Sequence, residues 1–146
     1  MADQNYSVVV TGSAQGVVQD VQLGAHHFRA DEPLEAGGTG HGPDPYALLL
    51  ASLGSCTSMT LGMYARRKGI PLQRVTVYLR HGRVYAGDCD DCETKVGKVD
   101  QIERRIVLDG ELTDEQRAAL LAIADKCPVH RTLTSEIKIR TSTGAP

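Results

Sequence analysis

The chain has 146 residues, of which 41% are hydrophobic and 23% are charged, and its formal net charge is −2. A chain of this length can bury most of its apolar surface as one unit, so we expect a single domain over residues 1–146. The near balance of charge and an aromatic content of 4% argue against nucleic acid as the main partner. No run of 18 or more apolar residues is present, and the N-terminus lacks the basic and apolar regions of a secretory signal. We therefore expect no membrane segment and a cytoplasmic location.

Three short segments near the N-terminus have the composition of strands. The segments "YSVVVTG", "GVVQDVQL" and "AHHFRADEP" are rich in β-branched residues and are punctuated by Gly and Asp. They predict a meander of three strands within residues 5–34. The next stretch, "EAGGTGHGPDP" at 35–45, has too much Gly and Pro for a regular element and predicts a loop.

A long central helix is predicted from about residue 45 to residue 68. Asp44 can serve as its N-cap with Pro45 at the first helical position, and no proline interrupts the sequence as far as Lys68. The segment "YALLLASLGSCTSMTLGMYA" is apolar almost all round, with only small or hydroxyl residues between. We therefore expect other elements, or a second copy of the chain, to cover this helix on all sides.

Residues 72–141 predict a β-β-α-β arrangement. The segments "LQRVTVYLRH" and "QIERRIVLDG" would form a hairpin across an acidic connection. "TDEQRAALLAIADK" begins with Thr113 and Gln116 in a capping-box pattern and predicts a second helix. Cys127 and Pro128 can start a short third helix, and the alternating "EIKIRT" predicts a last strand. The predicted fold class is α+β, with antiparallel sheets packed around the central helix.

The four cysteines, in a reducing compartment, are expected to be free, catalytic or metal-bound rather than part of a disulfide framework. Cys56 lies in the middle of the predicted central helix, where the preceding Gly54 and Ser55 would leave its sulfur accessible. The alternative is that Cys56 packs as a small hydrophobic residue, since cysteines are among the most often buried residues. The residues alone leave both interpretations open.

Cys127 lies in the setting of a reactive thiol. At the N-cap of a short helix its thiolate would be stabilised by unpaired backbone amides, and His130 and Arg131 would add positive charge about one turn away. The alternative is a plain helix-breaking Cys-Pro turn. Cys56 and Cys127 can cooperate only if the fold brings their Cα atoms to about 4.4–6.8 Å, which the sequence does not show.

Cys89 and Cys92 form a CxxC motif in the acidic segment "DCDDCE". The acidic neighbours would raise the thiol pKa values, which argues against a thioredoxin-type site. One interpretation is a pair of solvated loop cysteines. The other is half of a zinc site, for which His81, His41 or Asp88 would have to supply further ligands.

From about residue 6 to residue 141 the chain resembles the OsmC/Ohr family of osmotically inducible and organic-hydroperoxide-resistance proteins. Three motifs carry the resemblance: "GPDPYALLLASLGSCTSMT" around Cys56, "IADKCPVHRTL" around Cys127, and "RADEPLEAGGT" at 29–39, which is similar to a variant OsmC-like branch. The resemblance implies an intertwined homodimer with two active sites at the subunit interface, and thiol-dependent reduction of organic hydroperoxides. Cys56 would be the peroxidatic thiol and Cys127 the resolving thiol. A dithiol would be the reductant, and no cofactor is expected.

The sequence departs from the peroxidase members of that family at two positions. In those members an arginine from an early strand region and a glutamate ten residues before the first cysteine activate the thiol and hold the peroxide. Here Tyr46 stands in the place of the glutamate, and no arginine precedes Arg29. Arg29, His27 and His130 are the candidates to replace the missing groups. The alternative function is a small-molecule binding or stress protein of the same fold without efficient peroxidase activity, with or without a metal bound by the CxxC motif.

Overall fold

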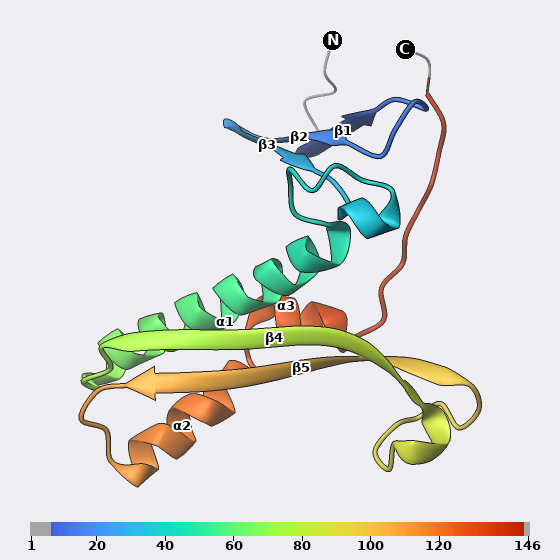
Figure 1. Ribbon diagram of the computed structural model, residues 1–146. Coiled ribbons are helices and arrows are strands. Elements are labelled where there is room, and N and C mark those ends of the chain that lie inside the picture. Colours follow the sequence, from blue (N-terminus) through green and yellow to red (C-terminus); the bar gives the residue numbers. More distant parts are fainter. Residues whose placement is uncertain (1–6, 145–146) are drawn as a thin grey trace. The chain divides into compact units, whose positions relative to one another are not determined.

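The computed structural model describes residues 7–144 (Figure 1). The chain divides into two compact units, residues 1–49 and residues 50–146. The first unit contains a three-stranded sheet, and the second contains a two-stranded sheet with helices. Helix α1 (Pro45–Lys68) starts in the first unit and continues through the second. The mixture of antiparallel sheets and helices is the α+β class that the sequence predicts.

The N-terminal sheet is an antiparallel meander of β1 (Val8–Gly12), β2 (Gln19–Leu23) and β3 (His26–Ala30), in the order β1-β2-β3. Val21 in the middle strand pairs with a residue on each neighbour, and its side chain is buried. The predicted three-stranded meander is confirmed. The start of its first predicted strand, before residue 7, lies outside the described residues.

A buried carboxylate orders the Gly-rich loop that follows β3. The Asp31 side chain is 2% exposed and accepts hydrogen bonds from the backbone amides of Glu32, Thr39 and His41 and from the Thr39 hydroxyl. The hydrogen bond from the Thr39 hydroxyl is the main cause that lowers the pKa of Asp31 to about 2. One carboxylate therefore fixes a loop that has a single 3₁₀ turn, η1 (Leu34–Ala36), as its regular element.

Helix α1 begins and ends as the sequence predicts. The Asp44 carboxylate accepts the amide of Ala47 at 2.9 Å, which makes Asp44 the N-cap and Pro45 the first helical residue. At the other end Gly69 adopts a left-handed φ of 66°, which glycine takes without steric cost. The next amide then bonds back into the last turn of the helix, and this closes it.

The second unit is built on a long antiparallel hairpin of β4 (Arg74–Tyr85) and β5 (Lys98–Asp109). The connection between the strands holds a short 3₁₀ turn, η2 (Ala86–Asp88), so the predicted hairpin with a long loop is confirmed. Helix α2 (Asp114–Ala124) starts with a complete capping box, as predicted.

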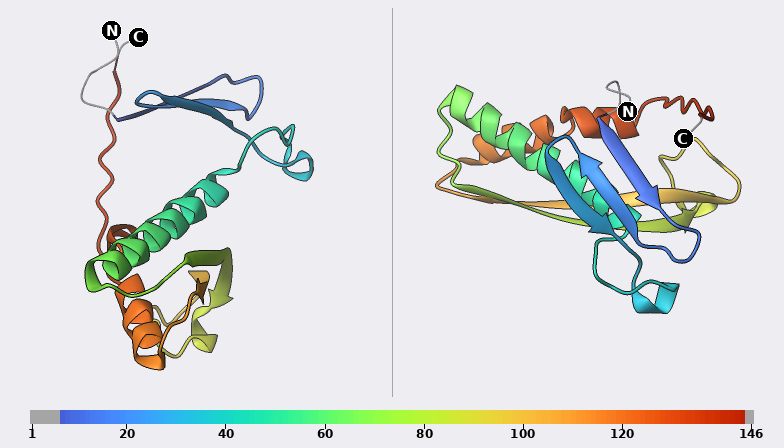
Figure 2. Two further views of the ribbon diagram at one scale, coloured as in Figure 1. Left: turned by 90° about the vertical axis from the view of Figure 1, so that its left-hand side faces the viewer. Right: turned by 90° about the horizontal axis from the view of Figure 1, so that it is seen from above.

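A hydrophobic core joins α1 and α2 to one face of this hairpin. The left view of Figure 2 shows both helices on the same side of the two strands. The side chains at the centre come from both helices, and half-buried residues of β4 and β5 pack against them. The buried centre consists of Leu61, Ala65, Leu120 and Ala124. Burial of this apolar surface holds α1 in place above the strands.

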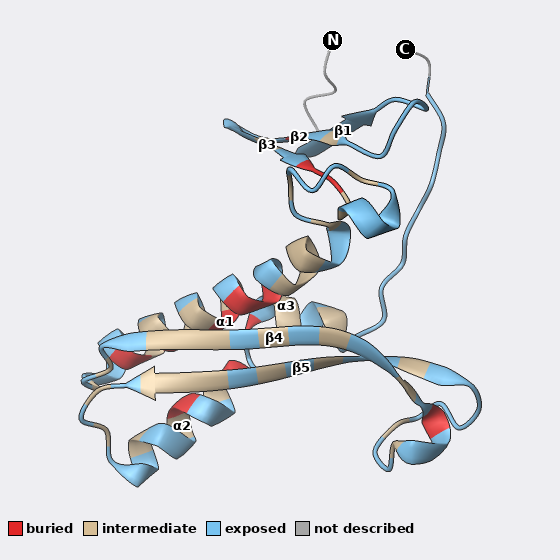
Figure 3. Cartoon of the chain, viewed as in Figure 1, coloured by how far each residue is buried: buried red, intermediate tan, exposed pale blue. Residues whose placement is uncertain are grey.

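Within the second unit, β4, β5 and α2 cover one face of α1, so this unit alone does not provide the expected cover on all sides. Figure 3 shows buried and exposed residues along the same helix, and the buried ones lie on one face. Met59 and Met63 are 67% and 63% exposed. The hairpin and α2 can contact only one side of the helix, so the sheet packs against α1 rather than around it. By length and composition alone α1 is also apolar enough to cross a membrane, a test that core helices of folded domains pass as well.

The last predicted strand, "EIKIRT", is not formed in the described part of the chain. After the short helix α3 (Pro128–Leu133), residues 136–141 have no regular secondary structure. Ile137 and Ile139 are 52% and 85% exposed. A strand needs hydrogen bonds from a neighbouring strand, and no described strand pairs with this segment. Alternation of apolar and polar residues is therefore not sufficient to form a strand here, because the segment has no partner strand in the described part of the chain.

Candidate active site

Two cysteines from distant parts of the sequence lie close together, one in α1 and one at the start of α3. Cys56 lies in α1 and is partly exposed, whereas Cys127 is fully buried, and both are free thiols. The Cys56 side chain lies close enough to Cys127 to help lower the pKa of the Cys127 thiol. Gly54 allows α1 to lie close to the strands at this level, since a Cβ there would be 2.7 Å from Leu79 Cδ1. The sequence did not show whether the fold brings these two cysteines together, and the structure places their side chains next to each other.

Local structure lowers the pKa of the Cys127 thiol. Burial alone raises it, but hydrogen bonds from the Cys56 side chain, the backbone amides of His130 and Val129, and the Thr57 hydroxyl outweigh this effect. Cys127 is the N-cap of α3, as predicted, and its sulfur accepts the His130 amide at 3.5 Å. Cys127 thus forms a thiolate more readily than an isolated cysteine would.

Arg104 of β5 connects the two segments that carry the cysteines. Its Nη1 donates to Thr57 Oγ1 at 3.0 Å and to the carbonyl of Ala124 at 3.4 Å, and its Nη2 donates to Asp125 Oδ1 at 2.9 Å. Thr57 Oγ1 also lies 2.7 Å from the carbonyl of Leu53. The single hydroxyl proton of Thr57 can therefore point to that carbonyl or to the thiolate. The Arg104 side chain is 12% exposed. Its guanidinium brings positive charge next to Thr57, which contacts Cys127.

Sequence reasoning missed Arg104, although a signal for it was present. Along β5 the half-buried residues Ile102 and Ile106 lie on one face of the strand, and the exposed residues Glu103 and Arg105 lie on the other. Arg104 is in phase with the half-buried set, which places a charged side chain on the inner face of the hairpin. A charge on an apolar face needs partners, and its presence predicts a polar network there.

His130 and Arg131, which the sequence predicted to add positive charge near Cys127, contact Cys127 through their backbone amides. The backbone amide of His130 contacts the sulfur, and its ring Nδ1 lies 4.0 Å from Asp125 Oδ1. Arg131 is exposed, and its amide donates to the Cys127 carbonyl at 3.0 Å. The backbone of the first turn of α3 therefore contacts both the sulfur and the carbonyl of Cys127.

The other predicted rim residues belong to the N-terminal unit. His27 and Arg29 both face Asp20, with ion-pair distances of 3.6 and 3.2 Å to Asp20 Oδ1. Both side chains are more than half exposed. Tyr46 lies in the first turn of α1 and is 56% exposed. Within their own unit His27 and Arg29 share one carboxylate.

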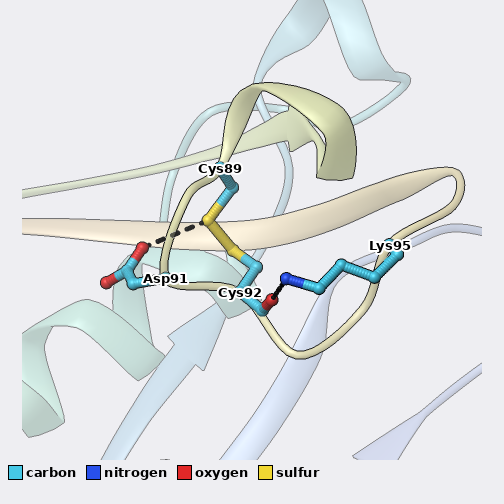
Figure 4. The surroundings of a disulfide bond; sticks show 4 residues. All are labelled: Cys89, Asp91, Cys92 and Lys95. Atoms are coloured by element: carbon cyan, nitrogen blue, oxygen red, sulfur yellow. Dashed lines mark hydrogen bonds between the residues drawn. A yellow bond between two sulfur atoms is a disulfide. The ribbon is translucent and has the colours of Figure 1, made fainter.

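The CxxC motif forms a disulfide in the structure (Figure 4). Cys89 and Cys92 are bonded to each other, so the expectation that all four cysteines are free or metal-bound is wrong for this pair. Only two residues separate them in the sequence, which lets a tight loop bring the sulfurs together. Among the described residues, one group could hold a metal ion: Cys89, Asp91 and Cys92. It does not include His41, His81 or Asp88, the extra ligands that the sequence suggested.

The buried pair has the parts needed for reversible thiol chemistry. A partly exposed thiol touches a buried one of lowered pKa, and an ordered polar network surrounds them. Oxidation of one sulfur would place it next to a second thiol that can form a disulfide with it.

Comparison with known proteins identifies the family. Residues 38–142 match the family model described as OsmC-like protein, and none of the curated proteins matches the chain. The chain is similar to the OsmC like protein from Mycoplasma pneumoniae, with 18% identity, a TM-score of 0.68, and 90% of this chain and 88% of that chain covered. It is similar to an organic hydroperoxide resistance protein OsmC from Legionella pneumophila, with 20% identity, a TM-score of 0.62 and coverage of 89% and 90%. An organic hydroperoxide resistance protein from Elizabethkingia anophelis has 20% identity, a TM-score of 0.65 and coverage of 90% and 89%. At these identities the solved structures establish a shared fold, and with the family match they show that the chain belongs to the OsmC-like protein family.

Proposed function

We propose that the protein is a thiol-dependent peroxidase that reduces organic hydroperoxides through Cys56 and Cys127. The observation that carries this proposal is the contact between the two free thiols, one partly exposed and one buried with a lowered pKa. Two of the similar solved structures are named as organic hydroperoxide resistance proteins, which supports the choice of substrate class.

In the first step Cys56 meets the peroxide, because Cys127 is fully buried. The Cys127 thiolate accepts the proton of the Cys56 thiol along the hydrogen bond between them. The Cys56 thiolate then attacks the peroxide oxygen and breaks the O–O bond. A proton is taken up, an alcohol leaves, and Cys56 becomes a sulfenic acid.

In the second step the sulfur of Cys127 attacks the Cys56 sulfenic acid. A disulfide forms and one water is released. A dithiol reductant then restores both thiols by exchange and is itself oxidised to a disulfide. Because the two sulfurs already lie in hydrogen-bonding contact, this step needs little movement of the chain.

Arg104 supplies positive charge in this proposal. Tyr46 has a phenol where the peroxidase members of the family have a carboxylate. The Arg104 guanidinium lies next to Thr57, which contacts the Cys127 sulfur. It would therefore stabilise the thiolate of the pair through that hydroxyl.

We propose that the working form is a homodimer. In the described part of the chain, apolar side chains are exposed on α1, at Met59 and Met63, and in the C-terminal segment, at Ile137 and Ile139. A second copy would bury this apolar area, which favours association. Sedimentation of the purified protein would show a species of twice the chain mass, and a monomer at micromolar concentration would contradict this part of the proposal.

The alternative is a protein of the same fold that binds a small molecule and turns over peroxide poorly. Tyr46 in place of the family's glutamate favours it. Peptide mapping separates the two. The fully reduced protein receives one equivalent of cumene hydroperoxide, remaining thiols are alkylated, and the digest is searched for disulfide-linked peptides. The proposal predicts a link between Cys56 and Cys127. Both residues alkylated, with the peroxide unconsumed, would favour the alternative.

A further inference from the structure

We propose that the loop at the end of the β4–β5 hairpin is a metal site controlled by oxidation state. When its disulfide is reduced, Cys89, Cys92 and Asp91 bind a thiophilic divalent cation such as Zn²⁺. The disulfide form offers no thiolate, so it does not bind the cation.

The geometry brings three ligand atoms together. The two cysteines have a Cα–Cα distance of 5.5 Å, and Asp91 Oδ1 lies 3.3 Å from Cys89 Sγ (Figure 4). All three ligand atoms lie within 4.8 Å of one another. Around a tetrahedral zinc ion two thiolates are roughly 3.8 Å apart, at Zn–S distances of about 2.3 Å. Once the S–S bond is broken, a small rotation of each side chain reaches that spacing.

The charge of the loop favours a cation over a free dithiol. Four acidic residues, Asp88, Asp90, Asp91 and Glu93, surround the two cysteines in sequence. Nearby negative charge disfavours an unpaired thiolate and makes the dithiol a poor nucleophile. A divalent cation reverses this, because each carboxylate then stabilises the bound charge. The same acids that argue against a thioredoxin-type site therefore argue for a metal.

Hydrogen bonds hold the backbone of the CxxC motif in place. The amide of Cys89 donates to the carbonyl of Ala86 at 3.2 Å, and Lys95 Nζ donates to the carbonyl of Cys92 at 2.5 Å. A hollow beside the loop, lined by Tyr85 and Gln101 among others, opens next to Cys89. This hollow gives a cation access and leaves room for water as the fourth ligand.

This site is separate from the buried thiol pair within one chain. Leu79 lies against Gly54, close to Cys56, whereas the loop starts after Tyr85. Six residues of extended strand span roughly 20 Å at about 3.3 Å per residue. Figure 1 shows the loop at the end of the hairpin where β4 ends and β5 begins.

A dithiol can reduce the Cys89–Cys92 disulfide by thiol–disulfide exchange. Two electrons and two protons pass from the dithiol to the Cys89–Cys92 disulfide, which gives two thiols, and the dithiol becomes a disulfide. Binding of Zn²⁺ then releases both thiol protons. In the reverse exchange a small-molecule disulfide takes two electrons from the two thiolates and two protons from water and becomes a dithiol, the Cys89–Cys92 disulfide forms, and the cation leaves.

Zinc titration against a chromophoric chelator tests the proposal. Wild-type protein is reduced with a dithiol, desalted without oxygen, and compared with the oxidised protein. We expect the reduced chain to bind one more Zn²⁺ than the oxidised chain. In reduced Cys92→Ser, whose change lies in an exposed loop, affinity should fall about 100-fold or more at that site.

The matched variants are Asp91→Asn and Asp90→Asn. Asp91→Asn removes a ligand and should weaken binding about 10-fold, whereas Asp90→Asn removes only a nearby charge and should change affinity much less. With Co²⁺ as the probe, a sulfur-to-metal charge-transfer band should appear in the wild type and be lost in Cys92→Ser. Failure of the reduced wild type to bind zinc, or equal binding by Cys92→Ser, would overturn the proposal.

Discussion

Replacing Cys56 with serine is expected to reduce the rate of organic hydroperoxide consumption by about 10,000-fold or more, the size of loss seen when a nucleophile is removed. Cys56 is partly exposed and touches the buried Cys127, so it is the sulfur that a peroxide can reach. A serine hydroxyl at this position has a far higher pKa than a thiol and does not attack the O–O bond at neutral pH. Stopped-flow measurement with cumene hydroperoxide and a dithiol reductant checks this.

Cys127→Ser is expected to behave differently. It should consume close to one equivalent of peroxide and stop in the presence of peroxide alone, because Cys56 is oxidised and no resolving thiol remains. The Cys56 sulfenic acid is then detected by mass after trapping with dimedone. Cys92→Ser is the control, since its sulfur lies in the hairpin loop. If Cys127→Ser loses the first turnover while Cys56→Ser keeps it, the roles of the two thiols are reversed.

Arg104→Met is expected to lower the free energy of unfolding by about 2–3 kcal/mol, because it removes three hydrogen bonds from a charged and largely buried donor. Thr57 and the carbonyl of Ala124 lose a partner, and the two cysteine-bearing segments lose their shared anchor. The pH at which the thiol pair reacts at half its maximal rate should also rise, because a stabilising positive charge is gone. Urea unfolding and the pH profile of the peroxide reaction measure the two effects.

Arg105 provides a matched control for this variant. It is the next residue of the same strand, is exposed, and lies with its guanidinium carbon 4.9 Å from the ring centre of Tyr78. Arg105→Met should cost about 0.5–1 kcal/mol and leave the pH profile unchanged. Arg104→Lys should restore part of the pH profile, since it keeps the charge but not all the contacts. An unchanged profile in Arg104→Met would show that Arg104 only stabilises the fold.

Features that depend on nearby residues were predicted well. The cap of α1 at Asp44, the capping box at Thr113 and the N-cap position of Cys127 are each set within one turn of helix. The hairpin followed from the alternation of apolar residues along two segments. Local sequence carries enough information for these elements, because their hydrogen bonds join residues a few positions apart.

Features that depend on distant contacts were predicted poorly. The exposed face of α1 and the unpaired "EIKIRT" segment depend on what lies beside them, which local periodicity does not encode. The Arg104 network joins residues far apart in the sequence. The Cys89–Cys92 disulfide depends on oxidation state as well as on the turn. The family resemblance implied that Cys56 and Cys127 act together, but the residues alone did not show that the fold brings them into contact.

The activity that we propose is the reduction of organic hydroperoxides by Cys56 and Cys127. The most direct test uses a chain with Cys89 and Cys92 both replaced by serine, so that the buried pair supplies all of its thiols. Cumene hydroperoxide consumption is followed by stopped flow with a dithiol in excess, beside the same concentration of free cysteine. We predict repeated turnover at a rate far above that of free cysteine. A rate equal to that of free cysteine would contradict the claim.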